Sequence, residues 1–180
     1  NENPLEVAKS FEAHGIEYDS KLVYVCDNNT DFEDGYENAQ KIMTENPDID
    51  AISICTWNNT HAEIAIAALD AGKHVLVEKP LSISVEEALA VEEAVKRSGK
   101  ILQIGFVRRH GTNTKLLKKF IDQDELGHIY YAKATCLRRL GNPGGWFSNQ
   151  SKSGGGPLMD LGVHMIDICW YMMGKPRPVS

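Results

Sequence analysis

The stretch Gly72-Lys73-His74-Val75-Leu76-Val77-Glu78-Lys79-Pro80 decides how this chain folds. It opens on a glycine typical of a helix end, and Val75-Leu76-Val77 then has the composition of a short buried strand. A charged pair, Glu78-Lys79, follows directly, and Pro80 restricts the backbone beside it. In an open parallel sheet, ligands bind outside the carboxyl ends of the strands. Taken alone, the stretch is compatible with a ligand site at this pair and equally with two solvated loop charges.

The composition is that of a globular protein. The 180 residues are 42% hydrophobic and 24% charged, which is enough to bury a core. The formal net charge of −6 and the lack of a Lys/Arg cluster argue against nucleic acid as a partner. No apolar run has membrane-spanning length, and Asn1-Glu2-Asn3-Pro4 does not have the pattern of a signal peptide. We therefore expect no membrane partner.

The cysteines and histidines indicate neither disulfides nor a metal site. The cysteines form no Cys-x-x-Cys pair, and three of them lie in apolar runs, which favours reduced, buried thiols in a cytoplasmic protein. The histidines show no ligand spacing, so we expect no metal. The cysteines are Cys26, Cys55, Cys136 and Cys169.

Helix-like and strand-like segments alternate through the first half of the chain. The predicted helices are residues 4–13, 36–43, 61–71 and a helix through Val95 that starts at the capping-box spacing of Ser84 and Glu87, and the predicted strands are residues 22–26, 51–55, 75–77 and 101–105. Strands separated by helices of about ten residues are typical of parallel βαβ units. The fold class is therefore α/β, a parallel sheet covered by helices.

The second half has a different pattern. Residues 114–121 predict a helix, and residues 128–140 alternate between apolar and polar side chains, as an antiparallel strand with one solvated face does. A Gly- and Pro-rich loop, residues 141–156, leads to a last helix over residues 157–173. This half predicts the start of an α+β domain with an antiparallel sheet. The side chains expected to face inward on the first helix are Leu116, Leu117 and Phe120.

The last predicted helix combines a polar file with an apolar stripe. Asp160, His164 and Asp167 are spaced so that they share one face. One interpretation is structural, with His164 satisfied by hydrogen bonds in a core. The other is catalytic, and the preceding Gly154-Gly155-Gly156 supports it, because glycines let the backbone approach another group closely. The stripe beside the file consists of Leu161, Met165, Ile168 and Met172.

These residues together resemble a known family. Glu78-Lys79-Pro80 and the run from Ser153 through Asp160 and His164 to Asp167 are similar to motifs of the Gfo/Idh/MocA oxidoreductases, the relatives of glucose-fructose oxidoreductase and inositol dehydrogenase. Two motifs about eighty residues apart are more specific than either one alone. Supporting matches are residues 46–56, residues 67–74 and Gly105-Phe-Val-Arg-Arg109.

The resemblance implies a two-domain enzyme. Residues 1–106 would form a partial NAD(P)-binding Rossmann-like domain, and residues 107–180 would begin the C-terminal substrate and oligomerisation domain. The implied reaction transfers hydride between NAD or NADP and a secondary hydroxyl or ketone of a sugar or polyol. Rival activities on the same fold are an NAD-dependent glycoside hydrolase and a non-catalytic regulator that binds dinucleotide or sugar.

The resemblance also implies roles for individual residues. His164 would act as general base, since its pKa lies near neutrality, and Asp160 would orient it. Lys79 would hydrogen-bond the reacting oxygen and stabilise its developing negative charge. The residues implied on the cofactor side are Thr56, Asn58, His61 and Glu78.

The chain departs from the family pattern in three places. No Gly-x-Gly-x-x-Gly turn is present, and we expect it upstream of residue 1, although an alternative alignment would make Asp27 the ribose-binding acid. Only the first strand of the family's large antiparallel sheet is recognisable. Trp57 and Phe147 replace residues usual in relatives. We expect a fragment of a roughly twofold longer, homo-oligomeric enzyme.

This expectation predicts that the 180 residues by themselves are inactive and bind NAD(P) weakly or not at all. Without the glycine turn, the backbone donors that hold the pyrophosphate are missing. Isothermal titration calorimetry of the 180-residue chain with NAD and NADP checks this, and micromolar binding would refute it.

Overall fold

The computed structural model describes residues 32–139, 141 and 143–179. The helix predicted over residues 4–13, the strand over 22–26, and Asp27 lie outside the described residues. The chain divides into two compact units, Asn1–Asp48 and Ile49–Ser180. In the first unit the structure describes helix α2 (Phe32–Glu45), which is longer than the predicted 36–43.

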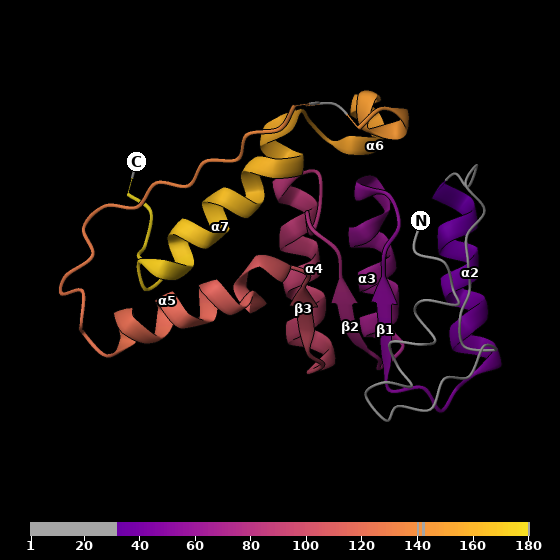
Figure 1. Cartoon of the computed structure of the whole chain (residues 1–180). Coiled ribbons are helices and arrows are strands. Elements are labelled where there is room, and N and C mark those ends of the chain that lie inside the picture. The colour runs from indigo at the N-terminus through magenta and orange to yellow at the C-terminus, as the bar shows by residue number, and fades with distance from the viewer. Residues whose placement is uncertain (1–31, 140, 142, 180) are drawn as a thin grey trace. The chain divides into compact units, whose positions relative to one another are not determined.

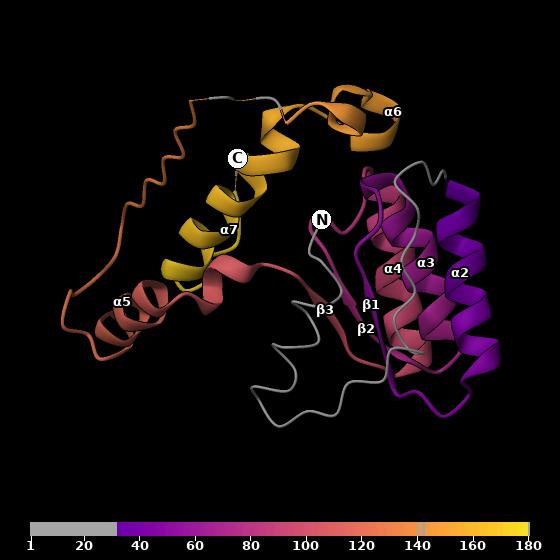
Figure 2. The same cartoon turned by 45° about the vertical axis from the view of Figure 1, so that its right-hand side comes forward.

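The second unit contains a parallel sheet of three strands, as the sequence predicts. The strands are β1 (Ala51–Ile54), β2 (His74–Val77) and β3 (Leu102–Ile104), in the spatial order β1-β2-β3. The register aligns Ile52 with Val75 and Val75 with Leu102. Helices α3 (His61–Asp70) and α4 (Val85–Ser98) connect the strands and lie together on one side of the sheet (Figures 1 and 2).

Small and branched apolar side chains explain how α3 packs on the sheet. Along β1 and β2 every second side chain is buried, and the alternate side chains, such as Leu76, are exposed. Helix α3 contributes alanines, which bring its backbone close to the strands. The buried core comprises Ile52, Ile54, Ala62, Ile64, Ala65, Ala68, Leu69, Val75, Val77, Val91 and Ala94.

The predicted capping box at the start of α4 is present. Ser84 Oγ accepts a hydrogen bond from the backbone N–H of Glu87, and the Glu87 carboxylate accepts one from the backbone N–H of Ile83. The side-chain bond of Glu87 therefore reaches one residue further upstream than in the usual motif. These bonds fix where the helix begins, directly after the Lys79-Pro80 segment.

The remaining elements are short helices. They are η2 (Asn58–Thr60), η3 (Val107–His110), α5 (Thr112–Asp122), η4 (Gly145–Ser148), α6 (Gln150–Ser153), a π-helical turn η5 (Leu158–Gly162) and α7 (Val163–Met172). The last predicted helix is thus present, but its first part is wound as a π-turn. No helix in the described ranges is long and apolar enough to cross a membrane.

Two predictions for the second half differ from the structure. Residues 128–139 form no strand, because a strand requires a hydrogen-bonded neighbour and no second strand lies beside them in the part of the chain that the structure describes. The alternation of exposure does survive, with Ala132, Ala134 and Cys136 less exposed than their neighbours. On α5 the apolar face is exposed rather than inward, with Leu116 53% exposed.

The cysteine prediction is partly wrong. Cys55, Cys136 and Cys169 are free thiols, as expected, but Cys55 is exposed because it lies on the face of β1 opposite to α3. Cys26 lies outside the described residues.

Burial on α4 predicts the effect of two matched substitutions. Val91 is 1% exposed and Val85 is 69% exposed. We expect Val91→Ala to lower the free energy of unfolding by about 2 kcal/mol, because it removes two buried methyl groups and leaves a cavity. The control Val85→Ala changes it by less than about 0.5 kcal/mol. Urea denaturation of both variants checks this, and equal effects would contradict the packing described for α4.

Candidate active site

The candidate site lies at the carboxyl edge of the sheet. The hydrogen-bond ladder continues one residue past each strand: Glu78 N–H donates to Ile54 O at 2.9 Å and Gly105 N–H donates to Val77 O at 2.7 Å. Because the strands are parallel, the loops after them start side by side. The first turns of the last helix lie on the side to which the strand arrows point (Figure 1).

Lys79 joins this edge to the π-turn. Its Nζ donates to the backbone oxygen of Asp160 at 2.8 Å and to Asp160 Oδ1 at 2.9 Å. The Lys79 and Asp160 side chains are 16% and 18% exposed. The peptide bond between Lys79 and Pro80 is cis. The structure thus brings together two candidate residues that lie 81 positions apart.

His164 begins its own turn of helix next to this pair. Its ring makes an edge contact with Phe106, with the ring centroids 6.4 Å apart. His164 Nδ1 is buried and has no hydrogen-bond partner among the described residues. The sequence predicts that Asp160 orients His164, but in the structure the Asp160 carboxylate accepts from Lys79 instead. The orientation of the imidazole must therefore come from packing.

The surroundings of His164 favour its neutral form. Burial lowers the pKa of His164 below its ordinary value, and the positive charges of Lys79 and Arg108 lower this pKa further. The negative charges of Glu78 and Asp160 oppose the shift in part. A neutral imidazole can accept a proton, so the ring has the protonation state that a general base needs.

Glu78 is held close to the backbone of its neighbouring strand. Its carboxylate accepts from the Lys79 backbone N–H at 3.2 Å. A Cβ at Gly105 would lie 3.1 Å from Glu78 Oε1 and 3.4 Å from Glu78 Cα, so only glycine allows this approach without displacement. The pair Glu78 and Gly105 therefore sets the spacing of the loops after β2 and β3.

The glycine-rich loop is fastened on two sides, as its sequence predicts. Gly154 has φ +76°, and a Cβ there would lie 2.6 Å from Ile83 Cβ, so the loop touches the segment after Pro80. On the other side, Asn58 Nδ2 donates to Ser153 O at 2.8 Å, and both residues are buried. This places Asn58 between the cofactor-side loop and the loop that leads to Asp160.

His61 and Thr56 hold the loops after β1 and β2 together. His61 is fully buried, with Nδ1 2.6 Å from Pro80 O and Nε2 3.1 Å from Thr56 O. Thr56 Oγ1 lies 2.6 Å from Thr60 Oγ1. Both ring nitrogens of His61 face backbone oxygens, so this side chain has no polar atom left to contact a cofactor directly.

Several residues at the site were not assigned a role from the sequence. Arg109 forms a buried, bidentate ion pair with Asp167, and its guanidinium lies over the Phe106 ring. Two signals could have indicated this pair. An arginine just past the end of a strand needs a counter-charge, and Asp167 is a carboxylate on a largely apolar helix.

The two sequence departures at Trp57 and Phe147 meet in one aromatic cluster. The ring centroids of Trp57 and Trp146 are 6.5 Å apart, and Trp146 stacks on Phe147 at 3.9 Å. Lys152 Nζ lies 3.6 Å from the centre of the Trp57 ring. The cluster lies next to Thr56 and Asn58, on the cofactor side of the site.

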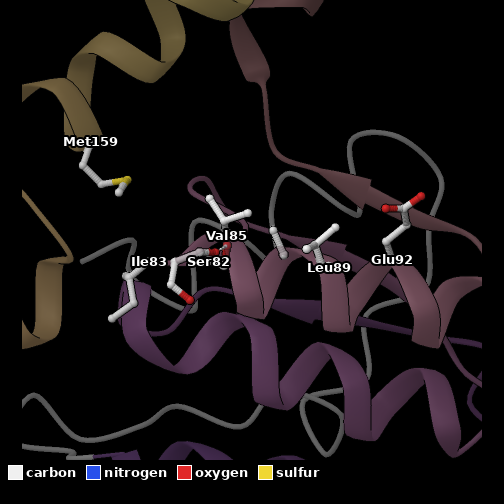
Figure 3. A pocket seen from close by; sticks show the side chains of 8 residues that line it. Ser82, Ile83, Val85, Leu89, Glu92 and Met159 are labelled. Atoms are coloured by element: carbon white, nitrogen blue, oxygen red, sulfur yellow. Dashed lines mark hydrogen bonds between the residues drawn. The ribbon is translucent and has the colours of Figure 1, made fainter.

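Other hollows and metal ligands do not compete with this site. A hollow of about 410 Å³ beside α4, shown in Figure 3, is lined by Ile83, Val85, Leu89 and Met159 among others, and is mostly apolar. Within the described ranges, no group of three His, Cys, Asp or Glu side chains could hold a metal ion.

Two open polar atoms make the edge suitable for a polar ligand. Asn59 Oδ1, in the loop after β1, and His164 Nδ1 are buried without a hydrogen-bond partner in the part of the chain that the structure describes. Unpaired buried polar atoms are costly unless a ligand satisfies them. Their place at the carboxyl ends of parallel strands fits a dinucleotide and a hydroxylated substrate.

Comparison with known proteins identifies two matching family models. Residues 5–106 match the model described as oxidoreductase family, NAD-binding Rossmann fold. Residues 114–180 match the model described as GFO/IDH/MocA C-terminal domain.

Curated relatives and solved structures are similar to this chain over most of its length. D-glucoside 3-dehydrogenase of Escherichia coli K12 is 36% identical over 174 residues, which are 90% of this chain and 49% of the relative. The scyllo-inositol 2-dehydrogenase (NAD(+)) of Bacillus subtilis is 41% identical over 143 residues, 79% of this chain and 39% of the relative. Levoglucosan dehydrogenase in complex with NADH and levoglucosan has a TM-score of 0.64 and 32% identity, covering 79% of this chain and 43% of that one. The chain thus spans about half the length of these relatives or less.

The charges around His164 predict its titration. Replacing Lys79 by Met removes a positive charge that lowers the pKa of His164 and leaves Asp160 unpaired, so we expect this pKa to rise. The control Lys100→Met, at the opposite edge of the sheet, leaves it unchanged. Titration of the imidazole resonances by NMR measures both, and an unchanged or lower pKa in Lys79→Met would contradict the arrangement.

Proposed function

Because the chain belongs to the Gfo/Idh/MocA oxidoreductase family, we propose that the whole protein transfers hydride between NAD or NADP and a secondary hydroxyl or ketone of a sugar or polyol. The observation that carries this proposal is the meeting of Lys79, Asp160 and His164 at the carboxyl edge of the sheet. The printed activities of the relatives, on a glucoside and on inositol, support the substrate class.

In the proposed mechanism, His164 takes the proton of the substrate hydroxyl. Burial and the nearby positive charges keep its imidazole neutral and ready to accept. Lys79 donates a hydrogen bond to the reacting oxygen and stabilises its negative charge, and Asp160 holds the ammonium in place. The bound nicotinamide supplies or accepts the hydride. In the reductive direction, His164 returns the proton.

We propose that the cofactor-side residues act in two ways. Thr56, Asn58 and Glu78 lie on the loops after β1 and β2 and would line the dinucleotide site. His61 would act indirectly, by fixing the backbone of Thr56 and Pro80 that it contacts. NAD is the first cofactor to test, since one solved relative contains NADH.

The wider organisation is also part of the proposal. Residues 1–106 would belong to the cofactor domain and residues 107–180 to the substrate and oligomerisation domain of a homo-oligomer. The free thiols of the described cysteines favour a cytoplasmic location.

A panel of sugars, glycosides and polyols tests the activity. The full-length gene product is mixed with each compound and with NAD or NADP, and nicotinamide absorbance is followed over time. Steady reduction of the nucleotide supports the dehydrogenase. Glycoside cleavage without net reduction supports the hydrolase instead, and binding without either reaction supports a regulator.

Two substitutions test the proposed roles. We expect Lys79→Ala and His164→Ala each to lower kcat about a hundredfold or more, within the usual range for groups that move protons or stabilise charge. The matched controls Lys100→Ala and His128→Ala, at residues that form no part of the site, retain kcat. Steady-state kinetics of the four full-length variants decides, and near-native turnover in either site variant removes that residue from its role.

A further inference from the structure

We propose that Arg109 and Asp167 form a clamp that positions the His164 imidazole for proton transfer. This inference rests on the proposed function and extends it to two residues that do not contact the reacting groups. The clamp is defined as the Arg109–Asp167 ion pair together with the Phe106 ring that Arg109 covers.

The clamp joins the end of the sheet to the last helix. Arg109, in η3 directly after β3, donates from Nε to Asp167 Oδ2 at 2.8 Å and from Nη2 to Asp167 Oδ1. The side chains are 20% and 6% exposed. A bidentate pair fixes orientation as well as distance. It therefore sets how α7 is placed against the edge that carries Lys79.

Apolar packing does not do this work at the same place. A hollow of about 540 Å³ separates β3 from α7, and Ile104, Val163 and Trp170 line it from both sides. Because the apolar side chains of the two elements leave this space between them, the position of α7 depends on its polar contacts with the sheet edge. The described polar contacts there are the clamp and the bonds of Lys79 to Asp160.

His164 needs such a clamp because its ring has no hydrogen bond of its own at Nδ1. A catalytic histidine is usually oriented by a partner at the nitrogen that does not react. Here Nδ1 has no such partner among the described residues, and the ring rests against Phe106. Arg109 lies 5.3 Å from the centre of the Phe106 ring and 5.2 Å from that of Tyr171. Asp167 lies one helical turn after His164, so the clamp restrains both the helix and the ring that His164 contacts.

Stability alone does not account for a buried ion pair. Taking two charges out of water costs about as much as their attraction returns, and well-packed apolar replacements are often neutral or stabilising. A structural role therefore predicts that an apolar pair of similar size preserves the protein and its turnover. A positioning role predicts that the protein is preserved and turnover falls.

The test is the double variant Arg109→Met/Asp167→Leu in the full-length protein. The matched control is Arg97→Met/Asp70→Leu, which removes a bidentate Arg–Asp pair with the same geometry between α4 and α3, 57% and 44% exposed. We expect the clamp variant to lose about tenfold to hundredfold in kcat, since a misplacement of about 1 Å can cost that much. KM and the thermal midpoint should stay close to native. Loss no greater than in the control would overturn the proposal.

Phe106→Leu provides a second variant that does not depend on removing buried charges. We expect it to lower kcat, whereas the matched control Phe120→Leu, on the exposed face of α5, does not. If the clamp variant fails to fold, this comparison decides, and native kcat in Phe106→Leu would overturn the proposal.

A readout independent of turnover separates this inference from the proposed function. In ¹H–¹⁵N spectra of the histidine rings, we expect one sharp tautomer for His164 in the native protein, and exchange broadening or a second tautomer in the clamp variant and in Phe106→Leu. Unchanged His164 signals in both variants would overturn the clamp. If the native protein turns over no compound in the panel, the proposed function fails while this spectrum still decides the clamp.

Discussion

The bonds from Lys79 to Asp160 are the interaction on which the rest of the site depends. They join a loop after the second strand to a helical turn 81 residues later, and both side chains are largely removed from water. In such surroundings an ion pair is stronger than on the surface, but it is also costly if either partner is missing. The pair therefore selects one placement of the π-turn on the sheet edge. That placement brings His164 within reach of the charges of Lys79 and Glu78.

Backbone contacts prepare the ground for this pair. The parallel ladder starts the loops side by side, and glycines at 105 and 154 allow neighbouring segments to approach more closely than any other residue would. His61 and Asn58 then tie these loops together through backbone oxygens. Positioning thus comes mostly from groups with no chemical role, which is typical of sites built on a rigid scaffold.

Local patterns carried most of the fold but little of the pairing. The sheet strands, the Ser84 cap and the meeting of Lys79 with the last helix were predictable, because strand composition, capping spacing and the family motifs each depend on nearby residues. The partner of Asp160 was not, since it lies on another element. The same holds for Arg109 with Asp167. The strand over residues 128–140 and the inward face of α5 failed for a related reason: both patterns describe surfaces that need a partner, and none covers them among the described residues.

The π-turn at Leu158–Gly162 has a consequence for which lengths of chain this site tolerates. A π-turn holds one residue more than an α-turn of the same span. Deleting any one residue within it would restore regular winding and rotate everything downstream by about 100° around the axis. The imidazole would then swing away from the ammonium without any change in either side chain. Evolution can thus vary the composition of this turn far more freely than its residue count.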